Sequence, residues 1–204
     1  MRHPLVGMSP HMGVSQRPRA WSWGSMLRDL LAKNREVILE RWFQLIVDTY
    51  PAQTSAALKQ KKDRFMNPVG YTIGKETEAL FQELLQGMDP NRLSASLNEL
   101  IKIRSVQDFS PSEAVGLVLL LKRAIGEVLK SEIQKEQFVE EWLQCYSKID
   151  QVALQAFDIY MDCREKICEV RVNRAKAERE TAFKMLERME VLKEKSDEGE
   201  GVNS

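Results

Sequence analysis

A regular apolar stripe dominates the last third of the chain. Glycine and proline, the residues least compatible with a helix interior, are both absent between Glu127 and Glu198. Within this stretch apolar residues recur at steps of three or four, the spacing that puts them on one face of an α-helix. We predict that this face is the interface of a parallel homodimer. Its residues are Ile149, Val152, Ala156, Tyr160, Cys163, Ile167 and Val170.

A helix through most of this stretch would be ~90 Å long. A domain of this size cannot cover such a rod, so part of the helix must stand in solvent or pair with another chain. Beyond Val170 the stripe changes phase, and Phe183, Leu186 and Met189 start a new face. Such a shift weakens the register of a coiled coil and suits a switch between two pairings. Fraying of a solvated helix end explains the same pattern, and both interpretations stay open.

Upstream, the sequence alternates between shorter helical patterns and turns. The segment from Ser110 to Glu113 is a complete helix start, with an N-cap serine, a proline in the first turn and the glutamate of a capping box. The helix that it opens is apolar nearly all round, so we expect this helix at the centre of the domain. No segment shows the two-residue period of a strand. Helices are predicted at 25–50, 54–62, 76–86, 91–103, from 111 onward and from about 134 onward.

These patterns predict an all-α fold, in which a compact helical bundle carries a long C-terminal helix that extends as a coiled-coil stalk. A globin-like plan is one arrangement open to such a bundle. Residues 1–25 contain three prolines and three glycines without a helical period, so we predict a disordered tail. Alternatively, translation begins at Met26. The predicted divisions are a tail at 1–25, a helical domain at 26–170, a connector helix at 171–195 and an acidic flexible tail at 196–204.

Two polar blocks interrupt the helical pattern and carry specific motifs. Residues 65–70 read F-x-N-P-V-G, and residues 103–114 read I-R-x-V-Q-D-F-S-P-S-x-A. Together with Tyr50-Pro51 upstream and F-D-x-Y at 157–160 downstream, they resemble the N-terminal domain of RsbT co-antagonist proteins of the RsbRD type. The resemblance runs from about residue 27 to about residue 171.

In that family the helical domain is an input module that precedes an output domain, such as a STAS domain or a histidine kinase. The resemblance therefore implies signal reception, with a helical connector that carries the signal onward. This chain departs from the multidomain pattern because only an acidic segment follows the connector, up to Ser204. We expect a stand-alone input domain, whose output half a partner would have to supply.

Polar residues of the two blocks are the candidate binding residues. They lie at predicted helix ends, where backbone groups lack helical partners. One interpretation is structural, with these side chains holding the loops in place. The functional interpretation makes them the rim of a pocket for a small anion or for an acidic side chain of a partner. The candidate residues are Arg64, Asn67, Arg104, Gln107 and Asp108.

Composition excludes several kinds of chemistry. Basic and acidic residues number 30 each, which gives no overall positive field for nucleic acid. Both histidines, His3 and His11, lie in the predicted tail, so a histidine-ligated haem, a histidine-based catalytic triad and zinc-protease chemistry lack their key group in the body. The longest apolar run, at 114–121, is much shorter than a membrane span. We expect no catalytic residue, cofactor, metal or membrane insertion.

The three cysteines are odd in number and form no C-x-x-C pair, which favours a reducing compartment and a cytoplasmic protein. Two hypotheses of function remain. The first is a regulatory domain that dimerises and relays the binding of a ligand or protein partner through its long last helix. The second is a helical adaptor or assembly protein that docks on a larger complex, such as a respiratory redox complex, with no signal involved. An enzyme is the weakest expectation.

Overall fold

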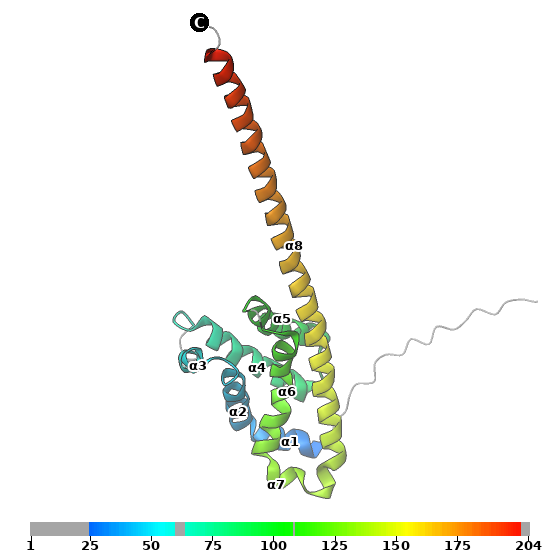
Figure 1. Ribbon diagram of the computed structural model, residues 1–204. Coiled ribbons are helices and arrows are strands. Elements are labelled where there is room, and N and C mark those ends of the chain that lie inside the picture. Colours follow the sequence, from blue (N-terminus) through cyan, green and yellow to red (C-terminus); the bar gives the residue numbers. More distant parts are fainter. Residues whose placement is uncertain (1–24, 60–63, 108, 201–204) are drawn as a thin grey trace, which may run out of the picture.

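The structure, a computed structural model, describes residues 25–59, 64–107 and 109–200, and the side chains of residues 26–189 among them. All regular secondary structure in these ranges is helical, so the predicted all-α fold with a long C-terminal helix is confirmed (Figure 1). The predicted tail at 1–25 lies almost wholly outside the described residues. The helices are α1 (Ser25–Lys33), α2 (Arg35–Val47), α3 (Ala52–Leu58), α4 (Pro68–Gln86), α5 (Pro90–Val106), α6 (Pro111–Val128), α7 (Lys130–Ile133), the 3-10 helix η1 (Glu136–Phe138) and α8 (Val139–Glu200).

Helix α6 lies at the centre of the body, as its apolar sequence predicts. It packs against α2 on one side and α8 on the other, and α5 joins α4 to α8. The buried indole of Trp42 on α2 donates a hydrogen bond of 2.8 Å from Nε1 to the Leu117 carbonyl of α6. One face of α6 is nevertheless open to solvent, and Leu119 is exposed there. The neighbouring helices are too few to enclose α6 completely.

Three helices begin with the same chemistry, a polar N-cap followed by proline. Asn67, Asp89 and Ser110 each accept a hydrogen bond from a backbone N–H in the first turn of α4, α5 or α6. The capping box predicted between Ser110 and Glu113 is present in both directions. The predicted start of the third helix at residue 76 is wrong, because the Asn67 cap already starts α4 at Pro68.

The ends of the long helix also differ from the prediction. The segment after α6 forms α7 and η1, and α8 begins at Val139, a few residues later than predicted. At its other end α8 continues to Glu200, beyond the predicted end of the connector at residue 195. Between Val139 and Glu198 the sequence contains no glycine or proline that could end the helix earlier. The far part of α8 projects well clear of the body (Figure 1).

The first half of the apolar stripe on α8 packs inside its own chain. It contacts α5 and α6, which present apolar side chains to it. This placement corrects the predicted homodimer interface, because four of its seven residues are buried in the body and unavailable to a second copy. Further along, Cys163 and Ile167 are half-buried and Val170 is exposed. The four buried residues are Ile149, Val152, Ala156 and Tyr160.

Lys148 on α8 gives the stability of the body a predictable pH dependence. Its side chain is buried, and burial lowers the pKa of the Lys148 amine to about 8, opposed by the neighbouring Cys145 thiol. The pKa of Cys145 is itself raised to about 12 by burial. Since an unfolded lysine has a pKa of ~10.4, the unfolded state binds more protons between pH 8 and that value, and stability rises with pH there.

We therefore expect the free energy of unfolding to depend on Lys148 above pH 8. Raising the pH from 7 to 9.5 should stabilise the wild type relative to Lys148→Met by about 2 kcal/mol, since the variant has no buried amine to neutralise. Urea unfolding of both proteins at the two pH values measures the difference. Equal pH slopes in the two proteins would contradict the prediction.

Candidate functional site

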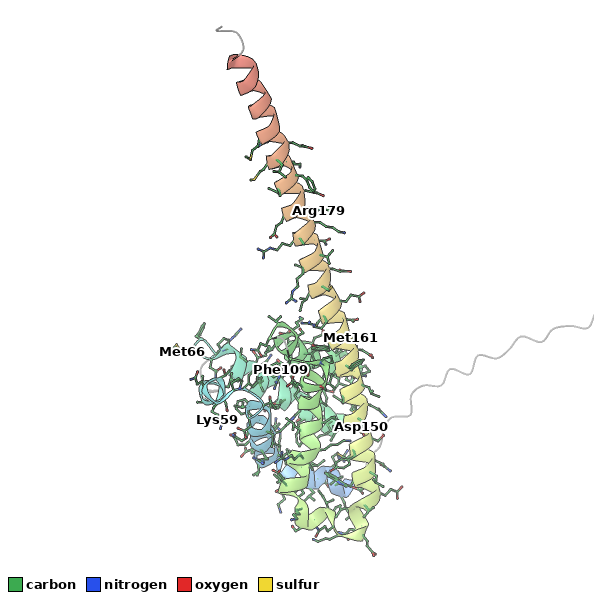
Figure 2. All side chains as sticks on the ribbon, viewed as in Figure 1. Lys59, Met66, Phe109, Asp150, Met161 and Arg179 are labelled. Atoms are coloured by element: carbon green, nitrogen blue, oxygen red, sulfur yellow. The ribbon has the colours of Figure 1, made fainter. Side chains whose placement is uncertain are left out.

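Several helix ends meet where α8 leaves the body. Arg104 stands in the last turn of α5, Tyr50 follows α2, and Phe109 precedes α6. Phe109 lies near the end of the body from which α8 projects, close to the level of Met161 on α8 (Figure 2). We name the cluster at this place the Arg104 junction. It consists of Tyr50, Arg104, Gln107, Phe109 and Tyr160.

The guanidinium of Arg104 lies at the centre of the junction and is held between two aromatic rings. Only 1% of the residue is exposed. Its central carbon is 4.4 Å from the centroid of the Tyr50 ring and 4.1 Å from that of the Phe109 ring. The two rings meet edge to face at 78°, with centroids 5.1 Å apart. This arrangement stabilises the cation through the ring faces.

Oxygen atoms at the end of α2 provide further contacts for Arg104. Its Nη2 donates to the Thr49 hydroxyl at 2.9 Å and to the Ile46 carbonyl at 3.4 Å. Its Nη1 is buried without a hydrogen-bond partner among the described residues. Burial lowers the pKa of Arg104, opposed by Tyr50 and Glu113, and burial raises the pKa of Tyr50. The junction thus encloses a charge at an energetic cost, which its aromatic and oxygen contacts offset.

Two hydrogen bonds connect α8 to residues in and beside the junction. The Tyr160 hydroxyl donates to the Phe109 carbonyl at 2.6 Å. One turn further along α8, Nη1 of Arg164 donates to the Ser105 carbonyl at 3.4 Å. A third bond, from the Tyr50 hydroxyl to Oε1 of Gln107 at 3.0 Å, connects the end of α2 to the end of α5. The ends of α2 and α5 and the start of α6 are therefore linked to the point where α8 leaves the body.

Asn67 lies in a different part of the body and has a structural role. Its side chain is buried, accepts from the Gly70 N–H at 2.9 Å, and donates to the Ala57 and Leu58 carbonyls at 3.0 Å each. A Cβ on Gly70 would stand 2.6 Å from the Leu58 carbonyl oxygen and 2.3 Å from Nδ2 of Asn67. The N-P-V-G motif therefore fastens the start of α4 to the end of α3.

The predicted binding residues do not form one pocket. Arg104 and Gln107 belong to the Arg104 junction, whereas Asn67 joins α3 to α4 and Arg64 is exposed on the connection between them. Met66, next to Asn67, stands well apart from Phe109 in Figure 2. Asp108 lies outside the described residues.

Sequence reasoning missed three members of the junction. Tyr160 was assigned to the homodimer interface, and Tyr50 and Phe109 were treated as motif positions without a role. A usable signal was present, because all three belong to the motifs, Tyr50 ends one predicted helix and Phe109 lies two residues before another. The sequence does not show that the ends of α2 and α5 meet in space, because the bonded residues Tyr50 and Gln107 are 57 positions apart in the chain.

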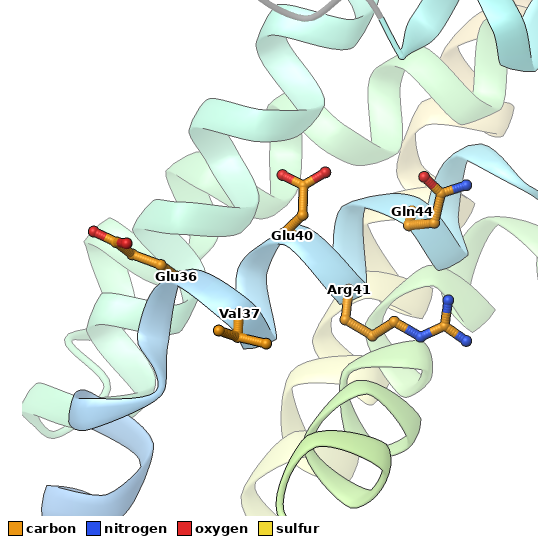
Figure 3. A pocket seen from close by; sticks show the side chains of 5 residues that line it. All are labelled: Glu36, Val37, Glu40, Arg41 and Gln44. Carbon is orange, nitrogen blue, oxygen red and sulfur yellow. The ribbon is translucent and has the colours of Figure 1, made fainter.

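The exposed face of α2 carries an open pocket of about 550 Å³, lined by five residues of this helix (Figure 3). Its Arg41 forms an ion pair with Glu127 of α6. Hydrogen bonds from Arg41 and then Arg123 lower the pKa of Glu127 to about 2. The arginine is thereby engaged within the chain. The lining residues are Glu36, Val37, Glu40, Arg41 and Gln44.

Among the described residues, no group of three or more histidine, cysteine, aspartate or glutamate side chains could hold a metal ion. The described helices include none with the length and apolar character that crossing a bilayer requires.

The fold and the site define a class of protein: an all-helical domain whose motif residues meet at the base of a long projecting helix. Residues 36–175 match the family model described as the RsbT co-antagonist protein rsbRD N-terminal domain, and the chain belongs to this family. The match includes the whole Arg104 junction. The family resemblance expected from the two motifs is confirmed, and the family is one of regulatory stress signalling.

One similar protein comes from the archaeon Archaeoglobus fulgidus, where it is described as an uncharacterized protein. It is 22% identical to this chain over 155 residues. The match spans 76% of this chain and 93% of the archaeal protein, which therefore consists almost wholly of the matched region. No solved structure matches.

Proposed function

We propose that the chain is a non-catalytic regulatory domain that dimerises and relays the binding of a ligand or protein partner through α8. The observation that carries this proposal is the Arg104 junction, which bonds the ends of α2 and α5 and the start of α6 to the base of α8. Membership of a regulatory family supports it. The archaeal protein supports a domain that acts without a fused output domain, since little of its length lies outside the match.

The relay follows from the chemistry of the junction. A partner that moves the end of α2 changes the contacts of Tyr50 and Thr49 with Arg104. Because the guanidinium is buried, it cannot replace these contacts with water, so Phe109 must shift with it. The Phe109 carbonyl accepts from Tyr160, and the displacement therefore reaches α8. A packed cluster of this kind favours discrete alternative arrangements over gradual deformation.

The remaining candidate residues have separate roles in this proposal. Arg64 is exposed and presents a cation to an acidic group of a partner, while Asn67 keeps its connection in place. Gln107 is the exposed member of the junction, and a bound group would reach it first. The cysteines are all free thiols, which supports a reducing, cytoplasmic location.

Removing one hydroxyl tests the relay. Tyr160→Phe deletes the bond to the Phe109 carbonyl and keeps the ring. Spin labels are placed one at a time on Asn173→Cys and Arg188→Cys, in a background with Cys163→Ser and Cys168→Ser. We expect the inter-chain distance distribution at both labels to shift or broaden in Tyr160→Phe, because α8 loses one of its bonds to the body.

Tyr71→Phe on α4 removes the hydroxyl of a tyrosine that lines a surface pocket between α4 and α2, and it is the matched control, with wild-type distances expected. Wild-type distances in Tyr160→Phe as well would show that α8 is a passive stalk. That result favours the alternative function, a helical adaptor that docks on a larger complex. Labels that show no inter-chain distance in any variant would contradict the dimer.

A further inference from the structure

The face of α8 turned away from the body carries a second apolar stripe. Its side chains are exposed even beside the body, where the opposite face of α8 is buried. Leu143 is 62% exposed, Leu154 68%, Phe157 44% and Met161 48%. These are large apolar groups in water at helical spacing. We name the set the outer stripe, and it consists of Leu143, Leu154, Phe157, Met161, Cys168 and Val172.

The outer stripe repeats every eleven residues. Leu143 and Leu154 are eleven apart, and so are Phe157 and Cys168. Met161 and Val172 continue to Phe183 at the same step. An eleven-residue repeat has 3.67 residues per turn, which keeps a stripe on one face of a nearly straight helix. The outer stripe therefore runs from the body onto the projecting part of α8, and Phe183 prolongs it.

The apolar stripe from Ile149 to Val170, here named the inner stripe, cannot pair with a second helix over this length. Its first four residues are buried in the body. Past Val170 the inner face carries polar positions such as Arg174 and Thr181, both exposed. Two charged residues interrupt the outer face, Asp150 between Leu143 and Leu154 and Arg179 between Val172 and Phe183. A second helix laid along α8 thus finds its densest run of apolar side chains on the outer face between Leu154 and Val172.

Charges beside the outer stripe point to the orientation of the partner. At 100° per residue, one edge of the stripe is acidic, with Asp158, Glu165 and Glu169, and the other carries Arg164 and Arg171. In a parallel pair of identical helices the acidic edge of each lies beside the basic edge of the other. In an antiparallel pair each edge lies beside its own copy, so like charges meet. Only the parallel pair is charge-complementary.

We propose that the outer stripe is the interface of a parallel homodimer, with a second copy of this chain as its occupant. The inference rests on the dimer of the proposed function and assigns it a surface. From Leu154 to Val172 the contact would be ~27 Å long, at ~1.5 Å per residue. Each body packs on the inner face of its own α8, so the two bodies would lie on opposite sides of the helix pair.

The positions of the cysteines allow an experiment to show which face of α8 contacts the second copy. A parallel two-fold axis places Cys168, in the outer stripe, opposite its own copy. Cys163 is five residues away, about 140° around the helix, on the inner side. Cys145 is buried. Disulfide cross-linking therefore distinguishes the two faces, since two thiols must approach to about 6 Å between Cα atoms to be joined.

The experiment uses the full chain, cross-linked with copper phenanthroline in air, together with the variants Cys163→Ser and Cys168→Ser. We expect covalent dimers from the wild type and Cys163→Ser, and none from Cys168→Ser. Light scattering of Met161→Glu provides a second measurement that does not depend on thiols. We expect the dissociation constant of the dimer to be at least tenfold higher in this variant than in the control Asn173→Glu, because residue 173 lies outside the outer stripe.

Each other outcome has a distinct meaning. A wild type that is dimeric by light scattering but cross-links through Cys163, with Met161→Glu still dimeric, overturns the outer interface and leaves the proposed function standing. A dimer that cross-links through neither cysteine and tolerates Met161→Glu overturns it equally. A wild type that stays monomeric at tens of micromolar overturns the dimer of the proposed function as well.

Discussion

Arg104→Ala is expected to lower the free energy of unfolding by about 3–5 kcal/mol, the cost of truncating a large buried side chain. The residue is almost completely buried between Tyr50 and Phe109. Alanine leaves a cavity between the rings and removes the donor to the Thr49 hydroxyl. Loss of packing by the long arginine stem adds to the loss of charge. Urea unfolding followed by circular dichroism measures the change.

Two variants show how much of this loss depends on charge. Arg104→Met keeps most of the volume and avoids burying a cation, so we expect it to lose less than Arg104→Ala. Arg174→Ala removes an exposed arginine of α8 that pairs with Glu178, and should change stability by about 0.5 kcal/mol or less. A loss in Arg104→Ala as small as that in Arg174→Ala would show that the junction contributes little to the fold.

Gly70→Ala is expected to destabilise the protein by about 2–3 kcal/mol through overpacking. The new Cβ would approach the Leu58 carbonyl oxygen to 2.6 Å and Nδ2 of Asn67 to 2.3 Å. The first of these is backbone and cannot rotate away. Relief of the contact requires α3 and α4 to separate, which weakens the two hydrogen bonds that Asn67 donates to the carbonyls of α3.

Gly116→Ala is the matched control on α6. Nothing lies within 4 Å of a Cβ at this position. Alanine in a helix interior costs less conformational entropy than glycine, so we expect stabilisation by about 0.5–1 kcal/mol. Thermal unfolding should therefore move in opposite directions for the two variants. Melting temperatures that rise in both would show that α3 yields to the added methyl group.

Local sequence signals predicted where most helices begin. Ser110 and Glu113 form the capping box that their spacing indicated, because the bonds of a capping box involve only neighbouring residues. The start of α4 was placed eight residues too late, since Gly70 and Gly74 weaken the helical pattern of this segment. Glycine is required at position 70 because the backbone there packs closely on Leu58. Leu58 belongs to a different helix, so the local sequence pattern does not reveal this contact.

The junction shows the opposite situation. Arg104 was identified as a candidate from its position at a helix end, but its aromatic partners were not predicted. Tyr50 lies 54 residues before Arg104, and Tyr160 lies 51 residues after Phe109, whose carbonyl accepts its hydrogen bond. No local pattern encodes contacts over such separations, because they depend on how the helices cross.

The sequence by itself determined that the chain is all-helical, that its last helix is long, and which residues share each face of that helix. These properties follow from backbone propensity and from periodicity, which are local. The tertiary structure alone decided what covers each face. A period of 3.6 residues shows that Ile149 and Tyr160 must be buried, but burial against the same chain and burial against a second copy give the same pattern. Only the packing of α8 on α5 and α6 resolves this, and it leaves the outer stripe of α8 uncovered by its own body.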